Sequence, residues 1–481
     1  MSLVKTFEAC YPHLPVWAQN VSISLYGLTY RQERLGGSFN EYQRSFEERD
    51  RWPAAKMGEY LNETLRGTLL HAFDHVPYYR RKWGEANIRR DDLLHFTVKD
   101  LAAFPITPKA DLRKDSEEFV AQDIPAKQLH RYYSSGSTGT PVTCICTASA
   151  HRQFVAAREA RSFGWAGTSI RHRRSMLGGR KVVPLGDARP PFHRMNWAED
   201  QIYFSAFHIS ARNVRHYVDA LNRFQPRLMT GYAHSHYLLA RLILEEGLQL
   251  DFRPEALVLS SEKLTLEMKT VLQNAFGARA FEEYGSVENC ILATECEQGR
   301  LHVNPDFGIL EIVDDQGLPV KKGETGRIIG TALLNPAQPL IRYEIGDRGA
   351  WATQSCACGR DHLPVLEEVV GRIEDTIIAP DGRETVRFHW LFLGVPHVLE
   401  GQIIQETIQR IRLRIVPAGD FSEQDASLLR KRITDHLGNV EVVVETTSEL
   451  PRTERGKFRA VVSLLPKEGL RDPHQLGPKV I

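Results

Sequence analysis

The sequence carries almost no net charge and contains no long apolar run. Its 61 lysines and arginines are balanced by 60 aspartates and glutamates, which leaves a net charge of +1. This balance argues against a nucleic-acid binder that relies on bulk positive charge. A membrane span needs about 18 consecutive apolar residues, and no stretch approaches that length. The N-terminal segment MSLVKTFEACYPH also lacks the apolar centre of a signal peptide. We therefore expect a cytoplasmic protein that binds neither nucleic acid nor membrane.

The sequence also lacks the lysine-containing phosphate loop of kinases and many ATPases. The segment SSGSTGTP, Ser134–Pro141, offers glycines and hydroxyls that can hold phosphate. However, Thr140 and Pro141 stand where that loop would carry its lysine. Kinase-like phosphate transfer is therefore disfavoured. Two alternatives stay open for the segment: a phosphate-holding loop of another kind, and a polar turn between strands.

Cysteine is scarce and odd in number, since the chain has seven. In a protein expected to stay inside the cell, this indicates thiols or metal ligands rather than a disulfide framework. Cys356 and Cys358 form a tight pair, and Cys296 and His302 lie close together upstream. Three thiolates and one imidazole suit a closed, structural zinc site, with Cys290 as a substitute ligand. The alternative is a set of buried thiols with a surface histidine, because spacing cannot prove that the two halves meet.

The 481-residue chain is long enough for two or more domains. Apolar residues recur at helical intervals in Met57–Val76, and residues 1–100 are predicted to be largely helical. In the middle of the chain, strand-like Pro226–Gly231 and Ala256–Ser261 flank an amphipathic helix over His234–Gly247. Strand, helix and strand in this order predict an α/β sheet.

The pattern changes in the last third of the chain. Alternating apolar runs around an Asp-Asp-Gln-Gly turn in Phe307–Thr331 predict antiparallel strands. Further on, Ile411–Pro417 alternates strictly, as a strand does. A capped helix is predicted to begin at Ser422 and to close at Gly438.

These patterns together predict a protein of the α/β class with two domains. A large, multi-layer α/β domain with a β-rich part would span residues 1–371. A small, mobile α+β domain would span residues 372–481.

Six short segments occur in a specific order, although each is common by itself. They are SSGSTGTP, SSEKL (Ser260–Leu264), YGSVE (Tyr284–Glu288), YEIGD (Tyr343–Asp347), GRIED (Gly371–Asp375) and PRTERGKF (Pro451–Phe458). With LPVWAQN, HVPYYR and FPITPKADLR near the N-terminus, they resemble the adenylate-forming superfamily of acyl-CoA synthetases, luciferases and peptide-synthetase adenylation domains. Within it, the chain is most similar to the phenylacetate–CoA ligase-like branch and its capsule-biosynthesis-type relatives. The resemblance covers nearly the whole chain.

The resemblance implies a ligase that uses ATP and Mg²⁺ in two half-reactions. A carboxylate attacks the α-phosphate of ATP, which gives an acyl-adenylate and pyrophosphate. A second nucleophile, often the thiol of coenzyme A, then displaces AMP. The main barrier is electrostatic because two anionic groups must meet, and a metal, a lysine and N–H donors offset that repulsion.

The resemblance also implies a role for each matching residue. Those expected to contact ATP or AMP are Ser134, Ser135, Gly136, Ser137, Thr138, Gly139, Ser261, Glu262, Glu283, Tyr284, Gly285, Ser286, Asp347 and Arg372. Thr138 and Glu288 would bind Mg²⁺, because hard cations take oxygen ligands. Lys457 would be the catalytic cation, and Glu374 and Asp375 would form the hinge of the small domain.

More detailed roles follow for several of these side chains. Tyr284 would place its ring near adenine, and Asp347 would accept hydrogen bonds from both ribose hydroxyls. Ser286 would contact the α-phosphate or the substrate carboxylate. Many family members have a lysine beside the loop proline, where this chain has Thr140 and Val142, so one phosphate contact is missing here.

Aromatic side chains before the YGSVE segment are the candidates for the acyl pocket. The flat rings of Tyr203, Phe204, Phe207 and Tyr232 favour an aromatic acid. The histidines that could hydrogen-bond a ring substituent, or could equally be ordinary core or surface residues, are His208, His234 and His236.

The acceptor of the acyl group stays open between a thiol and an amine. Coenzyme A is the default of the family, but relatives also use amines or carrier-protein thiols. The segment Ala379–Glu406 departs from the Gly-rich stretch of the better-known ligases and resembles the capsule-type relatives. A non-catalytic binding or assembly protein with this fold is a further alternative, and a homodimer is consistent with the sequence.

Overall fold

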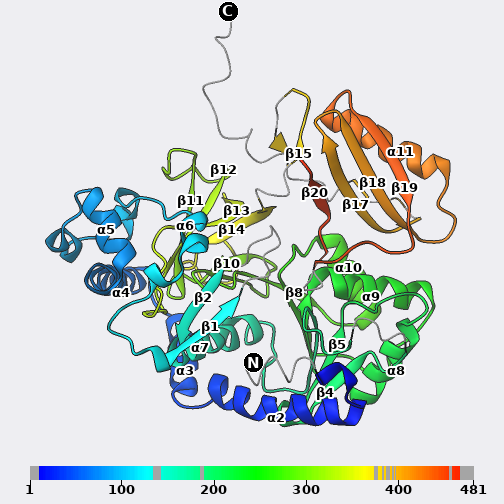
Figure 1. Cartoon of the computed structure of the whole chain (residues 1–481), viewed down its shortest axis with the longest axis horizontal. Helices are drawn as coiled ribbons and strands as arrows, with labels where there is room; N and C mark the ends of the chain where they lie inside the picture. Colours follow the sequence, from blue (N-terminus) through cyan, green and yellow to red (C-terminus); the bar gives the residue numbers. More distant parts are fainter. Residues whose placement is uncertain are drawn as a thin grey trace, which may run out of the picture. The chain divides into compact units, whose positions relative to one another are not determined.

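The computed structural model describes residues 10–133, 142–184, 189–372, 377–381, 384–385, 391–392, 395, 397–453 and 458–465. The chain divides into two compact units, of which the larger holds residues 1–371 and 452–457 (Figure 1). The smaller unit holds residues 372–451 and 458–481. Within the described part of the chain, no helix is both long enough and apolar enough to cross a bilayer.

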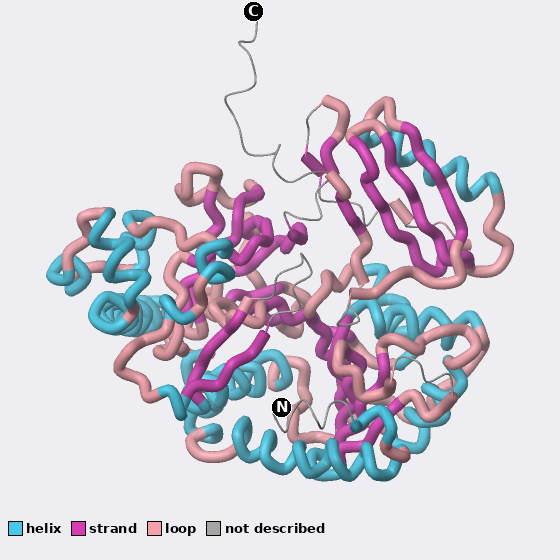
Figure 2. Tube along the Cα trace, in the orientation of Figure 1, coloured by secondary structure: helices cyan, strands magenta, loops and turns pink. Residues whose placement is uncertain are grey.

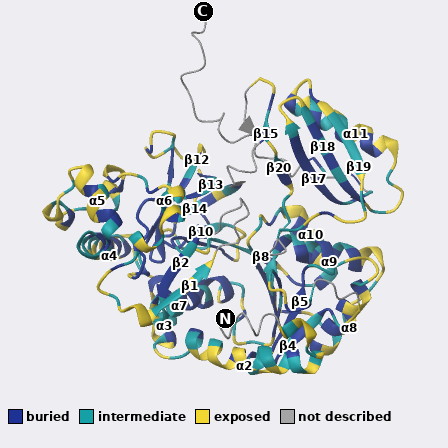
Figure 3. Ribbon diagram, in the orientation of Figure 1, coloured by how far each residue is buried: buried dark blue, intermediate teal, exposed yellow. Residues whose placement is uncertain are grey.

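The larger unit begins with helices, as the sequence predicted. Its helices are α2 (Val16–Leu35), α3 (Phe39–Arg49), α4 (Ala54–His75), α5 (Pro77–Glu85), α6 (Lys109–Lys114), α7 (Ala148–Arg158), α8 (Val214–Phe224), α9 (Ala233–Glu245) and α10 (Leu266–Phe276). Shorter turns are η1 (Tyr11–His13), η2 (Arg90–Leu94), η3 (Val98–Ala103), η4 (Glu117–Phe119), η5 (Ala126–Gln128), η6 (Glu159–Phe163) and η7 (Trp197–Glu199). The α4 helix confirms the helical pattern over Met57–Val76, because its buried residues recur every three or four positions. The outer side of α2 is largely exposed in Figure 3.

The described strands of the larger unit form a two-stranded hairpin and a 12-stranded sheet. The strands are β1 (Leu129–Tyr133), β2 (Thr143–Thr147), β3 (Arg174–Gly178), β4 (His193–Asn196), β5 (Gln201–Ser205), β6 (Leu228–Tyr232), β7 (Ala256–Ser260), β8 (Ala280–Gly285), β9 (Leu292–Glu295), β10 (Leu301–Val303), β11 (Gly308–Val313), β12 (Thr325–Ala332), β13 (Tyr343–Trp351) and β14 (Val365–Arg372). The sheet order is β11-β12-β13-β14-β10-β9-β8-β7-β6-β3-β5-β4.

The large sheet has a parallel part and an antiparallel part that meet at β8. Strands β5, β3, β6, β7 and β8 run parallel, with α8, α9 and α10 as their connections. Strands β8, β9, β10 and β14 are antiparallel neighbours, and so are β11, β12 and β13. The predicted antiparallel pair within Phe307–Thr331 is therefore confirmed. Apolar residues of α4 and α5 pack in one core with those of β11 to β13, which fixes the N-terminal helices on the β-rich part.

The smaller unit is an α+β structure. Its elements are β15 (Ile377–Ile378), β16 (Glu384–Thr385), β17 (Val398–Thr407), β18 (Arg410–Pro417), α11 (Glu423–Leu437), β19 (Glu441–Thr446) and β20 (Val461–Ser463). Four strands lie in the order β19-β18-β17-β20, and α11 packs its apolar side on this sheet (Figure 2). The predicted helix cap is confirmed, because Ser422 and Asp425 form a capping box and Gly438 ends the helix. The predicted α/β class with a separate α+β C-terminal unit is confirmed as well.

Candidate active site

Two distant segments meet where the parallel and antiparallel parts of the sheet join. One segment is the end of β8 with the following turn, and the other is the start of β13. The Tyr284 hydroxyl donates a hydrogen bond to Asp347 Oδ2 at 2.8 Å. The Tyr343 hydroxyl donates to Glu288 Oε1 at 3.1 Å. The YGSVE and YEIGD segments are thus joined by two cross-contacts, and each contact fixes a carboxylate.

Glu288 is buried and paired with a lysine. Lys109 Nζ lies 3.0 Å from Glu288 Oε1 and also donates to the backbone oxygen of Ile345 at 3.0 Å. Burial opposes the charge on Glu288, but the Lys109 ammonium and the Tyr343 hydroxyl outweigh it and lower the pKa of this carboxyl. Glu288 is therefore ionised at neutral pH, as a magnesium ligand must be.

Lys109 was missed as a functional residue in the sequence. It lies in FPITPKADLR, at the first residue of α6, a segment that contributed only to the family resemblance. Its partner Glu288 is far away in the sequence, so only the tertiary structure brings the two charges together. No local pattern would have revealed this pair.

The expected phosphate loop lies outside the described residues, and so does its Thr138. The loop joins β1 to β2, which pair antiparallel with Tyr133 opposite Thr143. Immediately after the loop, Val142 and Cys144 belong to the same apolar cluster as Tyr343. Burial and the nearby Glu288 charge raise the pKa of the Cys144 thiol. Cys144 of β2 therefore lies close enough to Glu288 for their charges to interact.

Arg158 is a second charged residue that sequence reasoning missed. It is the last residue of α7, and its Nε donates to Glu283 Oε1 at 3.0 Å. Its guanidinium also donates to Asn289 Oδ1 at 3.4 Å. A side chain at Gly285 would lie 3.7 Å from the same guanidinium. Glu283, expected at the nucleotide, is therefore part of an ion pair that supports the turn after β8.

Ser261 and Glu262 follow β7 and face α9. Ser261 has a φ of +74°, a left-handed conformation that costs a residue with a side chain roughly 1–3 kcal/mol. Glu262 Oε2 accepts a hydrogen bond from the backbone N–H of His234 at 2.9 Å. This contact places a carboxylate at the N-terminus of α9, where the helix dipole favours it. Ser286 has its hydroxyl 4.0 Å from the Cys290 sulfur.

Several expected site residues cannot be placed from the described part of the chain. Arg372 is the last residue of β14, but its side chain is not described. Glu374, Asp375 and Lys457 lie outside the described residues. Their expected roles in the hinge and in catalysis stay predictions.

The expected acyl-pocket residues do not all face one side of the sheet. Tyr203 and Phe204 are neighbours on β5, so their side chains point to opposite faces. The Tyr203 hydroxyl accepts a hydrogen bond from Arg180 at 3.0 Å, whereas the Phe204 ring stacks on Tyr217 of α8 at 5.6 Å. The two rings therefore cannot line the same pocket wall, because side chains alternate along a strand.

His208 and Phe207 follow the end of β5. The His208 ring stacks on Phe192 at 5.2 Å, and its Nδ1 lies 2.7 Å from the Ser205 hydroxyl. Phe192 in turn stacks on Tyr217, so His208 shares the aromatic packing against α8. The backbone N–H of Phe207 donates to the same Ser205 hydroxyl at 3.2 Å.

Tyr232 and His234 lie at the entry to α9, next to Gly231. Gly231 has a φ of +130°, and a Cβ there would lie 2.0 Å from the backbone oxygen of Leu177. Only glycine fits, so β6 and β3 approach closely just before Tyr232. His236 is fully buried and its Nδ1 contacts the backbone oxygen of Tyr232 at 2.9 Å, which is typical of a core histidine.

Glu282, on β8 beside the site, should make folding stability depend on pH. Burial raises its pKa to about 7, and the neighbouring Glu295 adds to this effect while Lys269 opposes it. As the pH rises, the unfolded chain loses the Glu282 proton near pH 4.5, whereas the folded state keeps it until about pH 7. The free energy of unfolding should fall as the pH rises from about 5 to 8, by up to roughly 3 kcal/mol from this group. Glu282→Gln should remove this decrease in urea unfolding curves measured across that range, while exposed Glu59→Gln should not. Parallel pH profiles for wild type and Glu282→Gln would contradict the assignment.

The four expected zinc ligands come together in the structure. Ligand atoms of Cys296, His302, Cys356 and Cys358 all lie within 4.8 Å of one another. The sulfurs of Cys296 and Cys356 are 3.6 Å apart, and Cys358 Sγ is 3.3 Å from His302 Nε2. Zn–S bonds of about 2.3 Å and Zn–N bonds of about 2.0–2.1 Å in a tetrahedron give edges of about 3.8 and 3.6 Å, close to these values.

The surroundings of the cluster favour a structural zinc ion. His302 Nδ1 lies 3.0 Å from the backbone oxygen of Leu363, an acceptor that directs Nε2 toward the thiols. Four protein ligands leave no open position for chemistry. Cys290, the substitute ligand, instead belongs to the apolar cluster with Tyr343, so the expectation that it could replace a ligand is wrong.

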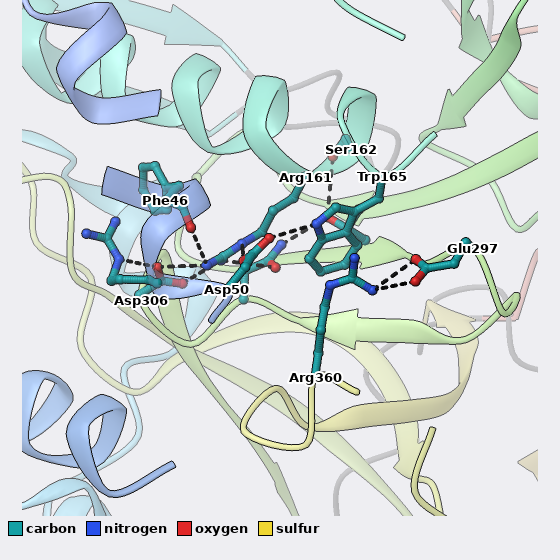
Figure 4. A network of polar contacts seen from close by, with 11 residues as sticks. Phe46, Asp50, Arg161, Ser162, Trp165, Glu297, Asp306 and Arg360 are labelled. Carbon is teal, nitrogen blue, oxygen red and sulfur yellow. Dashed lines mark hydrogen bonds and ion pairs between the residues drawn. The ribbon is translucent and has the colours of Figure 1, made fainter. Parts of the chain in front are cut away.

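A buried ion-pair network supports this cluster (Figure 4). Arg161 is fully buried in η6, and its guanidinium contacts Asp306 at 2.6 Å and Asp50 at 2.6 Å. Arg49 adds a contact to Asp306 at 2.5 Å. Burial disfavours both charges of the central pair, but their attraction prevails and lowers the pKa of Asp306. Breaking such a network by removing one partner typically costs 3–5 kcal/mol.

The same network reaches the cysteine turn through Trp165. The indole N–H of Trp165 donates to Asp50 at 2.8 Å, and the Arg360 guanidinium lies 4.2 Å from the indole ring. Arg360, two residues after Cys358, also pairs with Glu297 at 2.9 Å. Because Arg158 and Arg161 lie close together at the end of α7 and in η6, both the turn after β8 and the cysteine turn are connected to this helical segment.

Comparisons with known proteins agree with this fold. A family described as the CapK C-terminal domain matches residues 382–464. Protein CapK of Staphylococcus aureus is 24% identical over 458 residues, which cover 94% of this chain and 98% of that protein. The phenylacetate-coenzyme A ligase of Thermus thermophilus is 26% identical over 451 residues, which cover 86% of this chain and 97% of that enzyme.

A solved structure with a similar fold is a 2-hydroxyisobutyryl-CoA ligase in the postadenylation state, in complex with R3-HIB-AMP. Its TM-score is 0.67 at 20% identity, with 87% of this chain and 91% of that chain covered. The fold and the site thus define a member of the adenylate-forming superfamily, an AMP-forming acid ligase. Within that superfamily, the chain is similar over most of its length to CapK and to phenylacetate-coenzyme A ligases, which supports the branch that the six segments indicated.

Proposed function

We propose that this protein uses ATP to activate an aromatic carboxylic acid and then transfers the acyl group to the thiol of coenzyme A. Activation through an acyl-adenylate is the chemistry of its class. The observation that carries the proposal is the pair of contacts Tyr284–Asp347 and Tyr343–Glu288. These contacts place a ribose acceptor and a metal ligand on adjoining segments, which one bound nucleotide can reach together.

Each residue of the site has a separate proposed role in the first half-reaction, the formation of the acyl-adenylate. Glu288 would hold Mg²⁺, which neutralises phosphate charge when it is bound. Asp347 would accept the ribose hydroxyls, and the Tyr284 hydroxyl fixes its orientation. Arg158 and Glu283 keep the turn after β8 in place. Lys457 is proposed to stabilise the negative charge that develops as the carboxylate attacks the α-phosphate.

Aromatic acids are proposed as the substrate class on two grounds. The Thermus thermophilus relative carries phenylacetate in its name. In this chain, Tyr203, Phe207 and Tyr232 offer flat rings near the ends of β5 and β6. Phe204 and His208 are left out of this pocket because they belong to the packing against α8.

Coenzyme A is the proposed acceptor because the named ligases of the branch use it. The segment Ala379–Glu406 departs from the Gly-rich stretch of the better-known ligases, and residues 382–464 match the CapK C-terminal domain. Because of that departure, transfer to an amine or a carrier-protein thiol in a biosynthetic pathway is the second candidate. The four-residue Cys/His cluster is proposed to hold a structural zinc ion. The proposed setting is the cytoplasm, with a homodimer as the proposed assembly.

The test is hydroxylamine trapping of the activated acyl group across a panel of aryl, short-chain aliphatic and amino acids. We expect pyrophosphate release that depends on the carboxylate, with aryl acids giving the highest rates. Mass spectrometry with coenzyme A, amines and carrier protein then identifies the acceptor. Activity confined to aliphatic acids would overturn the aromatic assignment. ADP as the product would indicate a kinase, and the absence of both products would indicate a binding protein.

A further inference from the structure

A second group of metal-ligating side chains lies at the end of α4. His71 and His75 are one helical turn apart, and Asp123 faces both of them. His71 Nδ1 lies 3.8 Å and His75 Nε2 lies 4.0 Å from the same oxygen, Asp123 Oδ2. The two imidazole rings are 5.0 Å apart, and the three ligand atoms all lie within 4.8 Å of one another. We propose that these three residues form a binding site for a divalent transition-metal ion, separate from the cysteine cluster.

The distances fit a metal better than they fit ion pairs. Two imidazoles share one carboxylate oxygen, and both lie beyond the 2.7–3.2 Å range of a hydrogen bond. A tetrahedral ion with bonds of about 2.0–2.2 Å needs ligand atoms roughly 3.4 Å apart. The two imidazole–carboxylate distances, 3.8 and 4.0 Å, are slightly longer than this, and all three ligand atoms lie within 4.8 Å of one another. An ion would therefore draw these partly exposed side chains together as it binds.

Backbone contacts around the site hold its parts in place. His71 Nε2 lies 3.0 Å from the backbone oxygen of Pro336. Because this oxygen can only accept a hydrogen bond, Nε2 carries the ring proton, and the unprotonated Nδ1 is the nitrogen that lies near Asp123. The N–H of Gln122 donates to the backbone oxygen of His75 at 2.9 Å. The N–H of Ala121 donates to the backbone oxygen of Ala337 at 2.9 Å. Three segments of the chain are therefore fixed around the ligand atoms before any ion binds.

The ligand set selects the class of ion. Two imidazoles and one carboxylate suit zinc, nickel and copper, whereas magnesium and calcium prefer oxygen ligands throughout. Three protein ligands leave at least one position for water, unlike the closed cysteine cluster. An ion here would tie α4 to the segment around Asp123, so binding should also stabilise the folded state.

The experiment uses full-length protein that retains the metal it carries after purification without a histidine tag. Nickel ions are titrated into wild type, His75→Ala, Asp123→Asn and the matched control His95→Ala, an exposed histidine on another segment. We expect one added nickel per chain, with affinity at least about tenfold weaker in His75→Ala and Asp123→Asn and unchanged in His95→Ala. Nickel should also raise the unfolding temperature of wild type and of His95→Ala only.

Two outcomes would overturn the proposal. One is nickel binding of wild-type affinity and stoichiometry in both His75→Ala and Asp123→Asn, which would place the ion elsewhere. The other is no saturable binding of nickel to wild type. Far-ultraviolet circular dichroism and carboxylate-dependent pyrophosphate release should stay unchanged in all variants, because none of these residues belongs to the active site. Nickel binding is measured without any enzymatic assay, so this test can fail or succeed independently of the proposed function.

Discussion

Glu288→Gln should lower carboxylate-dependent ATP–pyrophosphate exchange by a factor of at least about 100, and the loss should persist at high Mg²⁺. Glu288 is buried, ionised and held by Lys109 and Tyr343, so its charge is available to a metal at a fixed position. Glutamine keeps the size and can still accept the Tyr343 hydrogen bond, but it removes the negative charge. The variant should therefore bind nucleotide without assembling the metal that neutralises the phosphates.

The control is Glu344→Gln, on the same strand as Tyr343. Glu344 pairs with Arg327 at 3.1 Å and has no expected role at the nucleotide. It should retain exchange within about twofold, because its partly buried side chain pairs with Arg327 and not with the groups around Glu288. Thermal unfolding of both variants separates a catalytic loss from a folding defect. Exchange in Glu288→Gln at the wild-type rate would remove Glu288 from the mechanism.

Cys356→Ser should release one equivalent of zinc per chain and destabilise the larger unit. The cluster joins the neighbouring strands β9 and β10 to the turn before β14, which is far from them in the sequence. Structural zinc contributes on the order of 10 kcal/mol in small zinc-dependent domains, and even a fraction of that would dominate the stability here. Elemental analysis gives the metal content, and differential scanning calorimetry gives the loss in unfolding temperature.

Two further variants make the zinc prediction specific. Cys10 is an exposed cysteine outside the cluster, so Cys10→Ser should change neither metal content nor stability. Cys290→Ser should destabilise the buried core yet retain the zinc, because Cys290 lies in the apolar cluster. A wild-type protein purified without any bound metal, and unaffected by a chelator, would refute the zinc assignment.

Local sequence signals predicted the elements well, because the physics behind them is local. The cap at Ser422, the helical period of α4 and the alternation within Ile411–Pro417 each depend on neighbours a few residues away. The partners of Glu288 and Glu283 could not be predicted in this way. Lys109 and Arg158 meet them only through the packing of α6 and α7 on the large sheet.

The assignment of both Tyr203 and Phe204 to one acyl pocket could have been avoided from the sequence itself. Tyr203 and Phe204 are adjacent on a strand, so strict alternation already places their rings on opposite faces. The position of His208 could not be predicted from the sequence, because its stacking on Phe192 depends on how α8 and the segment before β4 pack together. Aromatic composition alone therefore overstates the number of side chains that can line a pocket.

The Lys109–Glu288 pair has a consequence for the order in which ligands load. A resident ammonium beside Glu288 already satisfies the carboxylate, so free Mg²⁺ must compete with a tethered cation that is always present. A nucleotide that carried its own Mg²⁺ would bring phosphate oxygens as additional ligands for the ion. If Glu288 is the magnesium ligand proposed above, we therefore expect the empty protein to bind free Mg²⁺ more weakly than the nucleotide-loaded protein does.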